Sequence, residues 1–193
     1  MIKRLLACFA VVMLLAGCTE PVVFSEVFQL DQDDKLYTAY NLWYAPDNSI
    51  SCLNIQQGKF IPLGTEIEPI STSSFPSEIR FRTVDDNREY TISFSDGYRL
   101  CSMREYISYT FTTQSQSELL TDIPEDAAKR ICRGEVVVGM TPDQVKLTYG
   151  PPAKIRTPQE ENESWIYWIT PSENIRLVFR SGQVRNVLNL NQR

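Results

Sequence analysis

The side chains best suited to chemistry in this chain are its five cysteines, and no histidine accompanies them. The lack of histidine excludes Ser-His-Asp and Cys-His nucleophile systems and removes the commonest zinc ligand. No two cysteines have the Cys-x-x-Cys spacing of redox or zinc sites. The carboxylates Glu160, Glu161 and Glu163 have no neighbouring nucleophile or base, so we interpret them as an acidic loop between strands. The sequence therefore predicts a protein that is not an enzyme, with no metal or cofactor.

Cys18 directly follows Leu15, Ala16 and Gly17, at the end of an apolar run that a short basic start precedes. This pattern is typical of a secretory signal, and the run is shorter than the roughly 20 residues of a membrane-spanning helix. Leu-Ala-Gly before a cysteine resembles a bacterial lipobox. The resemblance implies cleavage before Cys18, acylation of that residue, and loss of residues 1–17. An ordinary signal followed by an unrelated cysteine is the alternative.

The charge balance limits the partners. The chain has 19 basic residues, two of them in the first 17 positions, against 24 acidic residues. Nucleic-acid binding depends on basic patches, so we exclude that class of partner. A polybasic contact with anionic lipid is excluded for the same reason, and membrane attachment depends on the acyl chains of Cys18. Residues 18–24 are expected to form a short tether.

Three cysteines remain in what the signal predicts to be an oxidising periplasm: Cys52, Cys101 and Cys132. We expect Cys132 on the buried face of a helix, and a Cys52–Cys101 disulfide is the preferred pairing. Three free, buried thiols are the alternative, because three cysteines do not determine a pair.

Residues 25–112 are rich in short runs of β-branched and aromatic residues, separated by polar turns. The expected strands cover residues 26–30, 36–44, 50–55, 60–70, 78–84, 88–94 and 106–112. This spacing predicts a small all-β domain, a barrel or a sandwich, whose role the sequence does not indicate. Residues 61–67 resemble a segment of bacterial SH3-like domains, so the expected domain is SH3-like or sandwich-like. A polar stretch at residues 112–117 is the expected domain boundary.

Residues 118–193 predict an α+β domain with two helices followed by a three-stranded antiparallel sheet. The first helix begins near Pro124 and ends before Gly134. The second has Thr141 as its cap and ends at Gly150. The expected strands cover residues 165–169, 175–179 and 184–190, with a tight turn before the last one.

A series of residues in this domain resembles the SmpA/OmlA family of small outer-membrane lipoproteins, which includes the E subunit of the β-barrel assembly machine. The residues that carry the resemblance are Gly139, Met140, Thr141, Gln144, Val145, Gly150, Pro152, Trp165 and Tyr167. The resemblance implies that these residues build the fold, and that the protein lies on the periplasmic side of the outer membrane.

Strand alternation places Trp165 and Tyr167 on the core face and Trp168 on the opposite face, where it is a candidate interface residue. The leading hypothesis is a non-catalytic lipoprotein that binds another envelope protein, such as the β-barrel assembly machinery. The alternative is an inhibitor or ligand-binding module, because the α+β unit of the family resembles the fold of β-lactamase inhibitory proteins. An enzyme is the least favoured hypothesis.

Overall fold

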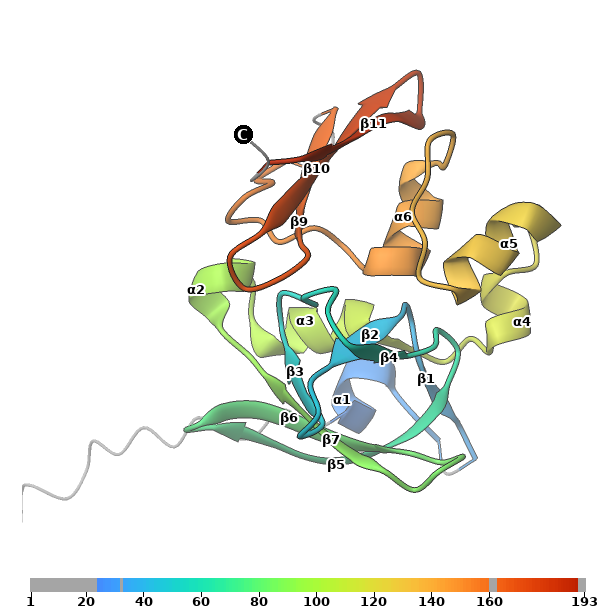
Figure 1. Cartoon of the computed structure of the whole chain (residues 1–193). Coiled ribbons are helices and arrows are strands. Elements are labelled where there is room, and N and C mark those ends of the chain that lie inside the picture. The colour runs from blue at the N-terminus through green and yellow to red at the C-terminus, as the bar shows by residue number, and fades with distance from the viewer. Residues whose placement is uncertain (1–23, 32, 160–162, 191–193) are drawn as a thin grey trace, which may run out of the picture.

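The computed structural model describes residues 24–31, 33–159 and 163–190. Leu15, Ala16, Gly17 and Cys18 lie outside the described residues. The fold is mixed α+β (Figure 1). The N-terminal half, residues 24–112, is built on a curled six-stranded sheet. The C-terminal half, residues 116–190, contains a three-stranded sheet that lies beside helices. Within these ranges no helix combines the length and apolar character needed to cross a membrane.

The main sheet has six strands in the order β3-β7-β6-β5-β1-β8. All of its neighbouring strands are antiparallel except β3 and β7, which run parallel. Its strands are β1 (Leu36–Thr38), β3 (Ser49–Ser51), β5 (Glu66–Ser74), β6 (Ser77–Thr83), β7 (Glu89–Ser93) and β8 (Phe111–Thr112). A two-stranded sheet pairs β2 (Leu42–Tyr44) with β4 (Lys59–Ile61).

The N-terminal half is not the all-β, SH3-like or sandwich-like unit that the sequence predicted. It contains the helices α1 (Phe24–Phe28), α2 (Asp96–Arg99) and α3 (Met103–Thr110). The predicted strands at residues 26–30 and 106–112 are therefore wrong, apart from the last two residues of the second one. Ser102 caps α3 by accepting a hydrogen bond from the Glu105 N–H at 3.1 Å.

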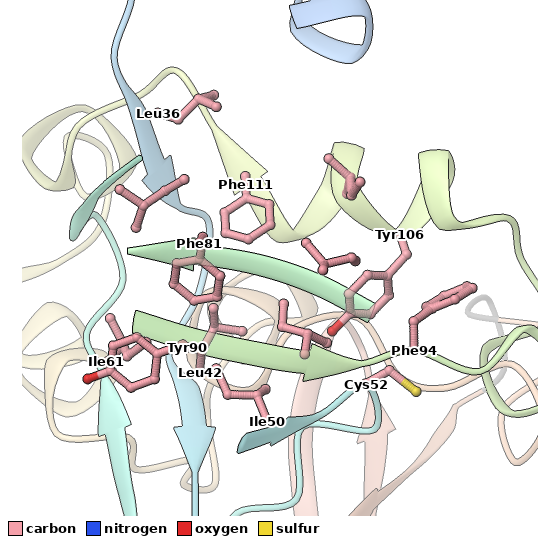
Figure 2. Close-up of a cluster of buried hydrophobic side chains, with 14 of the residues drawn as sticks. Leu36, Leu42, Ile50, Cys52, Ile61, Phe81, Tyr90, Phe94, Tyr106 and Phe111 are labelled. Carbon is pink, nitrogen blue, oxygen red and sulfur yellow. The ribbon is translucent and has the colours of Figure 1, made fainter. Parts of the chain in front are cut away.

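Helix α3 covers the sheet because its buried side chains, Tyr106, Ile107 and Thr110, share one helical face. Figure 2 shows Phe81 next to Phe111, and Tyr106 of α3 further along the core next to Phe94. The Phe81 and Phe111 ring centroids are 5.3 Å apart in an edge-on arrangement. The core of this half therefore combines side chains of α3 with side chains of both sheets.

The C-terminal half holds α4 (Gln116–Leu119), α5 (Glu125–Cys132) and α6 (Pro142–Tyr149). Helix α4 begins inside the polar stretch, residues 112–117, that the sequence predicted as the domain boundary. Three antiparallel strands follow in the order β11-β10-β9, and they are β9 (Ser164–Trp168), β10 (Asn174–Arg180) and β11 (Gln183–Asn189). The predicted helices and strands coincide with α5, α6, β9, β10 and β11 to within a few residues, but α4 was not predicted, so this half has three helices and not two.

The start of α6 confirms the predicted cap. The Thr141 hydroxyl accepts a hydrogen bond from the Gln144 N–H, and the Gln144 side chain accepts one from the Thr141 N–H. Gly150 ends the helix with a φ of +78°. Val145 lies in a core with Trp165 and Tyr167, the two strand residues that were predicted to be core. Leu63 of the N-terminal half is buried in the same core, so the two halves pack against each other.

Candidate functional site

The junction between the two halves is built around Asn41, a fully buried residue between β1 and β2. Its amide nitrogen donates to the carbonyl of Ile131 at 2.8 Å and to that of Thr148 at 3.2 Å. Its amide oxygen accepts from the Leu63 N–H at 2.9 Å. The last carbonyls of a helix have no partner within the helix. Asn41, in the N-terminal half, therefore donates hydrogen bonds to backbone carbonyls at the ends of both α5 and α6 in the C-terminal half.

Asn54 completes this arrangement from the loop after β3. Its amide nitrogen donates to the carbonyl of Asn41 at 2.9 Å and to the carbonyl of Tyr149 at 3.0 Å. Its amide oxygen accepts from the Trp43 N–H at 2.9 Å. Asn54 has a φ of +51°, a conformation that asparagine tolerates better than most residues. The two asparagines thus fix β2 to the ends of both helices.

Aromatic side chains of the N-terminal half fill the rest of the junction. The rings of Trp43 and Tyr149 meet edge-on, with centroids 5.6 Å apart. Gly150 packs against the Tyr40 ring so closely that an added Cβ would lie 2.5 Å from Tyr40 Cε2. Gly134 approaches Trp43 in the same way. Glycine at these helix ends therefore allows the two halves to come together.

Beside this junction lies an open cleft of about 550 Å³, with walls from both halves. It is lined by Ala39, Tyr40, Ser108, Tyr109, Phe111, Thr112, Gln114, Glu118, Leu119, Ile123, Asp143, Lys146, Leu147 and Pro151. Helix α3 and β8 supply one wall, and α4 and α6 supply the other. The volume is within the usual range of ligand pockets, and ligand sites often lie between two units of a fold.

The chemistry of the cleft suits binding. Leu119, Leu147 and other apolar groups line it, while Glu118 and Asp143 are exposed at it. The Lys146 ammonium lies 5.6 Å from the centre of the Trp165 ring. The cleft thus offers an apolar surface with charges of both signs.

The two tyrosines of the cleft remain protonated at neutral pH. Burial raises the pKa of Tyr40 and the pKa of Tyr109 above the ordinary range of a phenol. Each hydroxyl already has a partner. Tyr40 bonds to Thr110 at 3.1 Å, and Tyr109 accepts from Arg99 Nε at 2.9 Å. These hydrogen bonds hold the two hydroxyls in fixed positions. Because both phenols keep their protons at pH 7, neither can accept a proton from a substrate at that pH.

Arg99 is a buried residue that contacts both walls of the cleft. This residue is 4% exposed, and its guanidinium lies 5.2 Å from the Tyr109 ring centre and 5.5 Å from that of Tyr106. Its Nη2 donates to the Pro151 carbonyl at 3.2 Å. Tyr109 and Pro151 belong to opposite walls of the cleft. Arg99 therefore connects the two walls through hydrogen bonds and stacking.

The residues that carry the family resemblance lie in the core, in turns or at helix ends. Met140, Val145, Trp165 and Tyr167 are buried in the C-terminal core. Thr141 and Gln144 cap α6, Pro152 is buried after it, and Gly139 and Gly150 have positive φ. None of these residues lines the cleft.

Trp168, the predicted interface residue, is half-buried at the end of β9. Its carbonyl accepts a hydrogen bond from the Gln56 N–H of the N-terminal half at 3.0 Å. Its backbone therefore belongs to the internal junction. A role for its side chain in partner binding stays a prediction.

The Cys52–Cys101 disulfide is absent, and Cys52, Cys101 and Cys132 are free thiols. Cys52 is buried among aromatic residues of the N-terminal core, and burial raises its pKa. The Cys101 sulfur lies 3.5 Å from the Tyr109 hydroxyl oxygen. Among the residues that the structure describes, no three histidine, cysteine or acidic side chains gather where they could hold a metal ion.

The sequence analysis missed the two junction asparagines and the cleft. Asn41 was visible as a polar residue inside an aromatic run, a position where a buried hydrogen-bond role is expected. The cleft gave no local signal in the sequence, because its walls come from distant segments.

No protein-family model matches the chain, and no curated protein or solved structure matches it either.

Proposed function

We propose that this protein is a non-catalytic lipoprotein of the bacterial envelope that binds another envelope protein through the cleft between its halves. Acylation of Cys18 attaches it to the periplasmic face of the outer membrane. The residue after Cys18 is threonine rather than aspartate, which suits outer-membrane sorting under the enterobacterial rule. The body serves assembly or integrity of the outer membrane.

The observation that carries the binding role is the construction of the cleft. Its two walls come from different halves, and Asn41, Asn54 and Arg99 hold these halves together through buried or partly buried hydrogen bonds. A preformed surface loses little conformational freedom on binding, which favours affinity. The cleft is open and mixed in polarity, so a protruding segment of a protein suits it better than a small apolar molecule.

The C-terminal half supports membership of the SmpA/OmlA family. Helices α5 and α6 precede three antiparallel strands, and the Gly-Met-Thr, Gly-Pro-Pro and Trp-x-Tyr segments lie at turns, caps and core positions of this half. We infer that the C-terminal half is the family module. The N-terminal half is then an addition that provides one wall of the cleft.

Site-specific photocrosslinking in intact cells tests the binding role. A photoreactive residue at Glu118 or Asp143, both exposed at the cleft, is expected to capture the same envelope protein. The matched control is Arg185, which is exposed on β11 and outside the cleft. A partner captured from Arg185 and from neither cleft position would reject the cleft as the binding surface.

Membrane fractionation tests the anchor separately. The Cys18→Ser variant is expected to leave the outer-membrane fraction or to accumulate with its signal uncleaved. Cys132→Ser is the matched control, because Cys132 carries no lipid in this proposal and should stay in the membrane fraction. Membrane association of Cys18→Ser equal to that of the unchanged protein would reject lipid anchoring.

A further inference from the structure

The tip of the β5–β6 hairpin carries the most exposed large apolar side chain among those described. Phe75 is 98% exposed, at the turn between the paired residues Ser74 and Ser77. Figure 1 shows this hairpin projecting outward at the lower left of the molecule. The hairpin needs no apolar side chain there for packing, because its buried residues, such as Ile79 and Phe81, lie further from the tip.

The sequence around the tip is uncharged. Residues 69–77 include no charged side chain, although the whole chain has a net charge of −5. Apart from Phe75, this stretch consists of serine, threonine, proline and Ile70, which is 38% exposed. Membrane surfaces rich in anionic lipid repel an acidic body. The uncharged tip can therefore approach an anionic membrane surface without electrostatic repulsion from its own side chains.

The length of the tether limits how far the folded body can lie from the membrane that holds Cys18. The chain between Cys18 and Phe24 can span at most about 20 Å. Phe24 is anchored in the body, since its ring lies 5.4 Å from that of Phe111, which lies 5.3 Å from that of Phe81. From Phe81 the strand β6 runs about 17 Å back to the tip. Because a bilayer is a broad plane, the surface that holds the acyl chains can meet Phe75 when the body lies with this hairpin toward it.

We propose that the Phe75 tip inserts into the headgroup region of the membrane that holds Cys18. This inference rests on the proposed lipid anchor. An aromatic ring with polar neighbours is suited to this region, where apolar side chains lie at the boundary between headgroups and acyl chains. One ring adds little to attachment by acyl chains. Its effect is to fix which face of the body meets the membrane, and therefore which way the cleft points.

Tryptophan fluorescence in vesicles tests this proposal. The full acylated chain with Phe75→Trp is reconstituted into vesicles of phosphatidylethanolamine and phosphatidylglycerol, with or without bromine on the acyl chains. Bromine quenches only nearby tryptophan. The control is Val138→Trp, at a 59% exposed position in the loop between α5 and α6, at the opposite end of the molecule (Figure 1). The unchanged protein gives the background of the native tryptophans, and flotation of the vesicles reports the anchor.

We expect the added emission of Phe75→Trp to shift to shorter wavelength on vesicles and to be quenched by the brominated lipid. The emission of Val138→Trp should do neither. Equal quenching of the two variants on floated protein would overturn the membrane contact and leave the anchor standing. Failure of every acylated preparation to float would overturn the anchor, and the contact with it.

Discussion

The amide nitrogen of Asn54 donates a 2.9 Å hydrogen bond to the backbone carbonyl of Asn41, so two of the residues that join the halves are themselves connected. Asn41 reaches the ends of α5 and α6, and Asn54 reaches the end of α6 as well. Buried polar networks of this kind are strong only when every member is satisfied. Loss of either side chain therefore affects both halves.

The first prediction concerns Asn41→Ala. This change leaves the carbonyls of Ile131 and Thr148 and the N–H of Leu63 without the partner that Asn41 gives them. We expect a loss of about 3 kcal/mol in the free energy of unfolding, because a buried unsatisfied group costs about 1–3 kcal/mol. Urea denaturation followed by tryptophan fluorescence measures this loss.

Asn186→Ala is the control for Asn41→Ala, because Asn186 is exposed on β11. A change below about 0.5 kcal/mol is expected there. Equal stabilities of the two variants would show that Asn41 does not hold the halves together.

The second prediction compares two glycines that have nearly the same φ. Gly150 has a φ of +78° and packs against the Tyr40 ring, whereas Gly182 has a φ of +73° with nothing within 4 Å of an added Cβ. Gly182→Ala should cost about 1–2 kcal/mol from backbone strain alone. Gly150→Ala should cost about 1–3 kcal/mol more, because its ψ of 175° lies in a region open almost only to glycine and because its methyl group overpacks the junction. Thermal denaturation distinguishes the two, and similar melting temperatures would contradict the close packing of Gly150 on Tyr40.

Local chemistry explains why the C-terminal half was predictable from the sequence. The pair Thr141 and Gln144 marks the start of α6, Gly150 marks its end, and Ser181-Gly182 marks the last turn. These signals need only neighbouring residues. The interpretation of Trp165 and Tyr167 as core residues followed from strand alternation and is confirmed.

The N-terminal half was less predictable because long-range packing determines it. Residues 103–110 are rich in β-branched and aromatic side chains, yet they form a helix that covers the sheet. The run 36–44 divides at Asn41 into β1 and β2, which pair with different strands. The cleft and the Asn54–Tyr149 bond join residues far apart in the chain. No local pattern identifies such contacts.

The third prediction concerns stability at high pH. Burial, together with the nearby phenol of Tyr44, raises the pKa of Tyr90 from 10 to about 12. Because the pKa in the folded state is the higher one, Tyr90 contributes stability that is complete below pH 10 and is lost as the pH rises toward 12. In Tyr90→Phe, the free energy of unfolding should fall less steeply over this window. Urea titrations between pH 9 and 12 measure the slope, with exposed Tyr98→Phe as the control. Equal slopes for Tyr90→Phe and the unchanged protein would exclude this role.

The last prediction concerns the three thiols. Alkylation of the unfolded, unreduced protein should label Cys52, Cys101 and Cys132, because all three are free. In the folded protein, Cys52 and Cys132 should react slowly, since burial raises the pKa of each and the thiolate is the reactive form. Peptide mass spectrometry after timed alkylation gives the rate at each site, and a sample reduced beforehand provides the full labelling level. If reduction were needed before Cys52 and Cys101 could be labelled, the pair would form a disulfide in the native protein. The thiol of Cys101 would then not lie beside the Tyr109 hydroxyl.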